Sequence, residues 1–216
     1  MPRVLAVGAH HDDVEIGCGG ALARHRAVGD ATTILVASAS GYDHWREGAI
    51  RSSDTARAEG AAGAAVLGAE LLSLDLPTKG LVCNHELIEG IERVIVERRI
   101  DLVYTHWTGD THQDHRAVAG ATLAAARNLG SVLMYRSNPH ASGEPWVPTV
   151  FVDIGAYADT KEAALRAHAS ELRRRGEVWL EQLRAVAVAN GAIAGVRQAE
   201  AFVPAKLLLP FGAAGL

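Results

Sequence analysis

The sequence predicts an α/β protein built as one domain around a mainly parallel sheet with helices on both faces. Short, β-rich apolar runs alternate along the chain with Ala-rich or amphipathic stretches of helical spacing. A helix between two strands is the usual connection in a parallel sheet. A length of 216 residues is within the size that a single hydrophobic core supports, so we assign residues 1–216 to one domain.

Strands and helices alternate through the first half of the chain. A short apolar run ends at Gly8, and a helical pattern follows it and ends before Gly29. The same order is repeated twice, and Gly68 ends the second helix. The expected strands are 4–7, 32–37 and 71–74, and the expected helices are 20–28, 53–67 and 85–98. Residues 38–52 are expected to form a loop long enough to have a function.

The second half continues the alternation with shorter strands. The expected strands are 102–104, 132–135 and 149–152, and the expected helices are 112–127, 161–169 and 177–189. Units of this kind form a parallel sheet with right-handed crossovers, so the expected fold is Rossmann-like. In such sheets, ligands bind outside the carboxyl ends of the strands.

Composition excludes several classes of protein. Apolar residues make up 49% of the chain and charged residues 21%, as in an ordinary globular protein. The net charge of −4 argues against nucleic-acid binding, and Arg173 to Arg175 is interpreted as a solvated helix face. No apolar run is long enough to span a membrane and the first residues resemble a strand, so we expect a cytoplasmic protein. Cys18 and Cys83 are expected to be small buried residues.

A crowded acidic cluster follows the first strand. Two imidazoles and three carboxylates lie within six residues: His10, His11, Asp12, Asp13 and Glu15. Like charges at this spacing are unfavourable unless a cation or strong hydrogen bonds compensate them, so a bound metal ion is the simplest explanation. An acidic helix cap is the plainer alternative.

A second polar cluster follows the fourth strand and opens a helix. His112 and His115 are three residues apart, so both project to one side of the first helical turn, and Asp114 lies between them. Imidazole and carboxylate ligands suit Zn²⁺, and three protein ligands leave a coordination position for water. A lone histidine is more often a packing or surface residue, but two such clusters at neighbouring strand ends favour a metal site.

The two clusters together resemble the LmbE-like, or PIG-L-like, N-deacetylase family. The resemblance rests on residues 10–20, HHDDVEIGCGG, and on the later motif Asp110-x-His112-x-Asp114-His115. The family includes the N-acetylglucosaminyl-phosphatidylinositol, mycothiol-precursor and bacillithiol-precursor deacetylases. The resemblance implies a hydrolase with one zinc ion per chain that removes an acetyl or related acyl group from a small N-acylated amine. The implied substrate is an N-acetyl amino sugar or a natural-product intermediate.

The resemblance also assigns roles to residues. The implied zinc ligands are His10, Asp13 and His115. Asp12 matches the general base, which takes a proton from the attacking water. His112 matches the histidine opposite the base, and its protonated form is expected to stabilise the tetrahedral intermediate. Asp114 is expected to hold His112 and favour that charged form.

Five further residues are candidate substrate contacts. His11 stands where the family usually has proline, and we interpret it as a bystander, a substrate contact or an adventitious ligand, in that order. Either Arg51 or Arg57 is expected to reach the substrate. Trp107 is positioned to stack on a sugar ring, and Tyr42 is a candidate contact from the long loop.

Other functions stay open at this point. A binuclear zinc hydrolase of the metallo-β-lactamase type has the motif His-x-His-x-Asp-His, which residues 110–115 match except at Asp110. Another metal-dependent amide or carbamoyl hydrolase would use the same chemistry. A non-enzymatic metal-binding protein is disfavoured because Asp12 stands beside a complete ligand set. The sequence identifies neither the amine nor the acyl group, and it leaves association into a homo-oligomer open.

Overall fold

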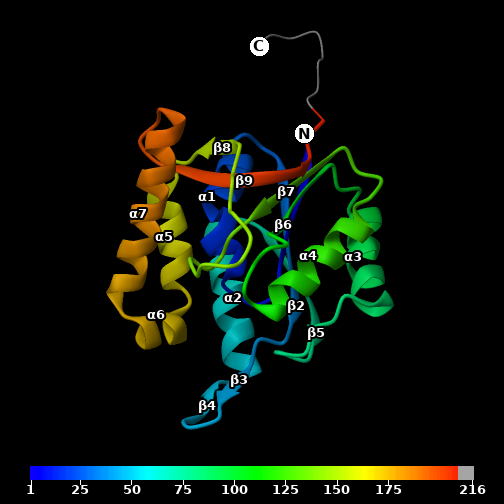
Figure 1. The fold of residues 1–216 in the computed structure, drawn as a ribbon, viewed down its shortest axis with the longest axis vertical. Coiled ribbons are helices and arrows are strands. Elements are labelled where there is room, and N and C mark those ends of the chain that lie inside the picture. The colour runs from blue at the N-terminus through cyan, green and yellow to red at the C-terminus, as the bar shows by residue number, and fades with distance from the viewer. Residues whose placement is uncertain (209–216) are drawn as a thin grey trace.

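A seven-stranded sheet forms the centre of the computed structural model, which describes residues 1–208 (Figure 1). The strands occur in the order β5-β2-β1-β6-β7-β9-β8. Their bounds are β1 Arg3–Gly8, β2 Ala31–Ser38, β5 Glu70–Leu76, β6 Leu102–His106, β7 Ser131–Tyr135, β8 Val150–Asp153 and β9 Ala199–Lys206. The first five of these strands pair in parallel, whereas β9 pairs antiparallel with both β7 and β8. The predicted α/β fold with a mainly parallel sheet is confirmed.

Helices cover both faces of the sheet, as predicted. Their bounds are α1 Asp13–Ala27, α2 Ser53–Leu67, α3 His85–Glu97, α4 Gln113–Ala125, α5 Ala158–Arg166, α6 Ala169–Arg175 and α7 Glu177–Ala194. In Figure 1, α3 and α4 lie on one side of the sheet, and α1, α2 and α5 lie on the other. Successive residues of a strand point to opposite faces. Leu5 and Val7 accordingly pack in the layer of α3 and α4, and Val4 and Ala6 pack in the layer of α1 and α2.

The strand order reverses at β1, which lies between β2 and β6. The chain passes from β1 through α1 to β2 on one side, whereas β6 is the neighbour on the other side. In an open α/β sheet, this reversal leaves a crevice at the carboxyl ends of the two strands. Strand β1 ends at Gly8 and β6 ends at His106, so both predicted polar clusters begin at this crevice.

Helix α1 is interrupted at Cys18, whose φ of −146° and ψ of 19° are not helical. The carboxylate of Glu200, on β9, accepts hydrogen bonds from the Gly20 N–H at 2.9 Å and the Ala21 N–H at 2.7 Å. It therefore satisfies backbone donors at the start of the segment after the break. Lys161 of α5 donates to the same carboxylate at 2.6 Å. The last strand thus fixes the course of the helix that carries the first cluster.

Several elements differ from the expectations. Helix α1 begins at Asp13, because the acidic cluster itself forms its first turn. Residues 38–52 contain an antiparallel hairpin, β3 Tyr42–His44 and β4 Gly48–Arg51, which projects from the rest of the molecule in Figure 1. The helix expected over 161–169 is divided between α5 and α6. Strand β9 is additional to the expected strands.

The two cysteines have different environments. Cys18 is buried, as expected, whereas Cys83 is exposed, which corrects the expectation for that residue. Both are free thiols. None of the helices described within residues 1–208 has the length and hydropathy that crossing a membrane requires.

Candidate metal and catalytic site

The three predicted metal ligands come together beyond the ends of β1 and β6. His10 follows β1, Asp13 begins α1, and His115 lies in the first turn of α4. His10 Nδ1 lies 3.3 Å from Asp13 Oδ2, and His115 Nε2 lies 3.3 Å from Asp13 Oδ1. One ligand atom from each residue lies within 4.8 Å of the other two. Two distant segments of the chain therefore meet at one point.

This donor set fits a zinc ion. With ligand distances of about 2.0–2.2 Å in tetrahedral coordination, neighbouring ligand atoms are separated by about 3.3 Å. The two separations given above have this value. The three residues line a cavity of ≈ 390 Å³, so a fourth position is accessible to water or substrate. Two overlapping groups of metal-ligand type are His10, His112, Asp114 and His106, Asp110, His115.

Neighbouring carboxylates raise the pKa values of His10 and His115. Burial lowers the pKa of His10, but hydrogen bonds to Asp114 and Asp13 outweigh burial and raise the pKa to about 9. Burial also lowers the pKa of His115, but the charges and hydrogen bonds of Asp13 and Asp110 outweigh burial and raise the pKa to about 10. Burial would raise the pKa of Asp13, but the neighbouring imidazoles hold it well below its usual range. A metal ion that binds here displaces protons from the imidazoles.

Asp12 lies beside the ligands and faces the same cavity. Its φ of 145° is a conformation that only a constrained L-residue adopts, and its side chain is buried. Burial, followed by repulsion from Asp13, raises the pKa of Asp12 to about 6. A carboxylate with a pKa in this range can accept a proton and release it again, which is what a general base requires.

His112 has a different environment from the one expected. Its Nδ1 accepts a hydrogen bond from the backbone N–H of Asp114 at 3.2 Å. The Asp114 carboxylate instead lies 3.1 Å from His10 Nε2, and it accepts bonds from the backbone N–H groups of Lys79 and Leu81. Burial and the neighbouring histidines lower the pKa of His112, and the charge of Asp114 does not overcome them. The geometry thus differs from the expected one: the Asp114 carboxylate contacts His10, and Nδ1 of His112 is an acceptor.

Three residues belong to this site although the sequence suggested no role for them. His106, at the end of β6, is fully buried, and its Nε2 lies 3.2 Å from Asp13 Oδ2. Asp110 Oδ2 lies 3.1 Å from His115 Nδ1. Ser137 Oγ, beyond β7, lies 3.5 Å from His106 Nδ1 and 3.4 Å from His115 Nδ1. The first two lie within the second polar cluster and could have been found there, whereas Ser137 has no signal in the sequence.

Two of the five predicted substrate contacts line the cavity. They are Tyr42 and Arg51, which pair with each other across the β3–β4 hairpin, at the end away from its turn. The Tyr42 hydroxyl donates to Glu171 Oε1 at 3.1 Å. The Arg51 guanidinium is 3% exposed and donates to the Ser40 carbonyl at 3.2 Å. The hairpin therefore contributes one wall of the cavity.

His11 is not among the residues that line the cavity, and this position fits the first of its three interpretations, a bystander. The residue is 1% exposed, and within residues 1–208 neither of its ring nitrogens has a hydrogen-bond partner. A Cβ atom placed on Gly60 of α2 would lie 2.3 Å from His11 Nδ1. The imidazole therefore occupies space that a side chain on α2 would otherwise fill.

Arg57 and Trp107 are likewise not among the residues that line the cavity. The exposed Arg57 pairs with Asp54 at 2.7 Å and Asp75 at 3.1 Å. Trp107 is buried and packs edge to face against Trp146, with 5.4 Å between the ring centroids. Of the two candidate arginines, Arg51 is the one that reaches the cavity.

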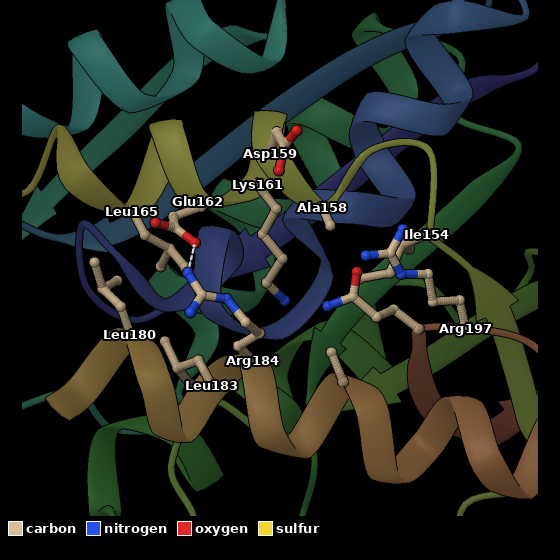
Figure 2. Close-up of a pocket in the computed structure, with 12 residues that line it drawn as sticks. Ile154, Ala158, Asp159, Lys161, Glu162, Leu165, Leu180, Leu183, Arg184 and Arg197 are labelled. Carbon is tan, nitrogen blue, oxygen red and sulfur yellow. Dashed lines mark hydrogen bonds and ion pairs between the residues drawn. The ribbon is translucent and has the colours of Figure 1, made fainter. Parts of the chain in front are cut away.

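A second cavity, of ≈ 300 Å³, lies between α5 and α7 (Figure 2). Three of its charged side chains, Lys161, Glu162 and Arg184, form ion pairs. Arg184 donates to Glu162, the pair joined by a dashed line in Figure 2, and the ammonium group of Lys161 binds Glu200. None of the metal-ligand groups found in residues 1–208 lines this cavity. The groups suited to hydrolysis therefore lie at the β1 and β6 crevice.

Comparison with known proteins identifies the family. The family model described as PIG-L, GlcNAc-PI de-N-acetylase, matches residues 5–126, which include all six predicted ligand and catalytic residues. The chain is 30% identical over 177 residues to YaiS of Escherichia coli K12, described as an uncharacterized deacetylase; the match covers 77% of this chain and 90% of YaiS. It is 29% identical to the diacetylchitobiose deacetylase of Thermococcus kodakarensis, with 96% of this chain and 85% of the relative covered.

A solved structure shows the same fold with a different activity. The 4-carboxy-2-hydroxymuconate hydratase GalB of Pseudomonas putida KT2440 superposes with a TM-score of 0.81 and 22% identity, covering 99% of this chain and 100% of GalB. The fold alone is therefore compatible with more than one reaction. The chain belongs to the GlcNAc-PI de-N-acetylase family of amide hydrolases, as its two polar motifs predicted.

Proposed function

We propose that the chain, acting as a single domain over residues 1–216, is a zinc-dependent N-deacetylase with one zinc ion per chain. The observation that carries the proposal is the convergence of His10, Asp13 and His115 beside a cavity that Asp12 also faces. These three residues would hold the ion. When bound, zinc lowers the pKa of water towards neutrality and polarises a carbonyl group.

The other residues handle protons. Asp12 accepts the proton of the water that attacks the amide carbon, and it later delivers that proton to the leaving amine. The Nδ1 atom of His112 accepts the Asp114 N–H, so the neutral ring carries its proton on Nε2. We propose that this N–H stabilises the negative charge that develops on the amide oxygen. One amide and one water give one amine and one carboxylic acid.

We propose an N-acetyl amino sugar as the substrate. The diacetylchitobiose deacetylase named above supports this class of substrate for a related chain. The polar lining of the cavity supports it as well, because imidazole, hydroxyl and guanidinium groups can bind sugar hydroxyl groups.

The test is amine and acetate release from a panel of N-acetylated amines and amino sugars, with and without a chelator. We expect turnover of at least one amino sugar, loss of turnover on chelation, and recovery when zinc is added back. Elemental analysis should give one zinc per chain, whereas two would favour a binuclear hydrolase. Turnover that is unaffected by chelation, or no amine from any compound in the panel, would contradict the proposal.

A further inference from the structure

The wall of the catalytic cavity carries more positive charge than its own carboxylates neutralise. Four cationic side chains line it: Arg51 on β4, Lys79 after β5, and Arg174 and Arg175 on α6. Three carboxylates line it, and two of these, Asp12 and Asp13, belong to the proposed metal centre. The third is Glu171.

Glu171 is shared by all three arginines. Its Oε1 lies 3.6 Å from Arg51 Nη1 and accepts the Tyr42 hydroxyl at 3.1 Å. Its Oε2 accepts from Arg174 and from Arg175 Nε, the latter at 3.2 Å. A single carboxylate therefore serves three guanidinium groups, and two positive charges remain without a carboxylate of their own.

Lys79 adds a third unmatched charge. Its ammonium group donates to the Asp43 carbonyl and lies 5.2 Å from the centroid of the Tyr42 ring. Within residues 1–208, no carboxylate oxygen lies within 4.0 Å of Lys79 Nζ. Four cationic side chains therefore face the cavity from one hairpin, one loop and one helix, and Glu171 is the one lining carboxylate outside the proposed metal centre.

Three of these groups, Lys79, Arg174 and Arg175, are exposed and are placed to contact a ligand. The Arg51 side chain is 3% exposed and already binds the Ser40 carbonyl, so its role is to support the wall. The side chains of Arg174 and Arg175 are 44% and 37% exposed. The Arg175 guanidinium lies 5.3 Å from the Trp179 ring centroid, which holds it in place.

We infer that the substrate of this site carries an anionic group, a phosphate or a carboxylate, on the part of the molecule that remains with the amine, and that Arg174, Arg175 and Lys79 bind it. The inference rests on the proposed deacetylase function and narrows its substrate class. Guanidinium groups bind carboxylates and phosphates through paired hydrogen bonds, and an ammonium adds a compact point charge.

The test compares three N-acetylglucosamine derivatives that differ only at carbon 1: the methyl glycoside, the carboxymethyl glycoside and the 1-phosphate. A hydrogen-bonded charge pair contributes about tenfold to a hundredfold in affinity. We expect kcat/KM to be at least about tenfold higher for one anionic derivative than for the methyl glycoside. The two anionic derivatives distinguish carboxylate from phosphate recognition. Equal or better turnover of the methyl glycoside would overturn the inference.

Arg174→Gln and Arg175→Gln should each lower the ratio of kcat/KM for the anionic derivative to kcat/KM for the methyl glycoside towards one. Arg173→Gln is the matched control, because Arg173 is exposed on the same helix and does not line the cavity. Arg173→Gln should keep the wild-type ratio, and loss of the ratio in this control would contradict a specific anion site. Circular dichroism and thermal melting establish that each variant is folded.

A binding measurement separates this inference from the proposed reaction. Calorimetric titration of the wild-type protein with glucosamine 1-phosphate, the carboxymethyl glycoside of glucosamine and the methyl glycoside requires no turnover. Preferential binding of an anionic amine without deacetylation of any substrate would support the anion site and contradict the deacetylase. Deacetylation without any anion preference would support the deacetylase and contradict the anion site.

Discussion

Asp12 occupies a conformation that L-residues rarely adopt, and this places two consecutive carboxylates in different roles. Its φ of 145° stores strain of about 1–3 kcal/mol. Asp13 turns towards the histidines, whereas Asp12 faces the cavity with a pKa of about 6. The backbone conformation of Asp12 therefore turns the proposed base and the neighbouring proposed metal ligand, Asp13, in different directions.

Asp12→Asn is predicted to lower kcat by about 10²–10⁴-fold while zinc stays bound, because the amide cannot accept a proton. Steady-state kinetics and elemental analysis of the same preparation check both parts. Loss of zinc together with activity would show that residue 12 is a ligand and that the two carboxylates have been assigned in the wrong order.

His115→Ala is predicted to abolish stoichiometric zinc binding, because it removes one of three ligands. The measurement is zinc per chain after dialysis against a weak chelator. His85→Ala is the control, since its side chain is 91% exposed on α3 and lies outside every candidate metal group found in residues 1–208. Full zinc content in the His115 variant would mean that another group of residues binds the metal.

Two glycines of helix α2 leave the space that side chains of the first cluster occupy. A Cβ atom on Gly60 would meet His11, and one on Gly63 would lie 2.6 Å from Glu15 Oε1 and 3.1 Å from His168 Nε2. His168 Nε2 also lies 3.2 Å from Glu15 Oε1. The side chains behind the metal-ligand turn therefore depend on the absence of side chains from one stripe of α2.

Gly60→Ala is predicted to destabilise the fold by about 1–3 kcal/mol, because the buried His11 ring has no free space into which it can move. Replacing glycine by alanine inside a helix would by itself stabilise by about 0.5–1 kcal/mol. Gly120→Ala on α4 is the matched control, since its Cβ would meet its nearest neighbour, Cys83 Sγ, at 3.4 Å. Chemical denaturation measures both variants, and a Gly60 variant as stable as the Gly120 variant would contradict the proposed packing.

Across the whole molecule, Glu171 connects the projecting hairpin to helix α6. Burial raises the pKa of Glu171, but the hydrogen bond from Arg174 and the neighbouring guanidinium charges outweigh burial and lower it. A carboxyl group whose pKa is lower in the folded state stabilises the fold when it is ionised. This stabilisation is present above the pKa of the unfolded chain and is lost as the pH falls through the folded-state value.

Glu171→Gln is therefore predicted to cost about 2 kcal/mol of unfolding free energy at neutral pH, and the cost should shrink between about pH 5 and pH 3. Urea denaturation at a series of pH values measures the difference. Glu181→Gln, an exposed site on α7, is the control and should differ from the wild type by less than about 0.5 kcal/mol at every pH. A constant difference for Glu171→Gln would mean that its carboxyl group keeps the same pKa on unfolding.

The sequence predicted the parallel part of the sheet and the metal-ligand group, because both depend on local patterns. Apolar runs such as 4–7 define strands by themselves, and parallel strands bring their carboxyl ends to one edge. Residues at those ends, such as His10 and His115, could therefore be paired before the structure was known. The family match and the geometry agree with that pairing.

The remaining features depend on contacts between distant residues. Ion pairs with Asp54 and Asp75 hold Arg57, and packing against Trp146 holds Trp107. His11 lies against Gly60 of α2, and no spacing rule reveals any of these contacts. Ser137 reaches the site because β7 lies next to β6. The lowered pKa of His112 results from burial and the neighbouring histidines outweighing a nearby carboxylate, a balance that depends on the surroundings in three dimensions.

The bond from Glu200 to the broken helix α1 has a consequence for biosynthesis. A ribosome makes the amino end first, so the acidic turn and both imidazole ligands are synthesised well before residue 200. Until that residue emerges, the second segment of α1 lacks the acceptor for its first amide groups. The second segment of α1 can therefore gain this acceptor only after the other strands of the sheet have been synthesised.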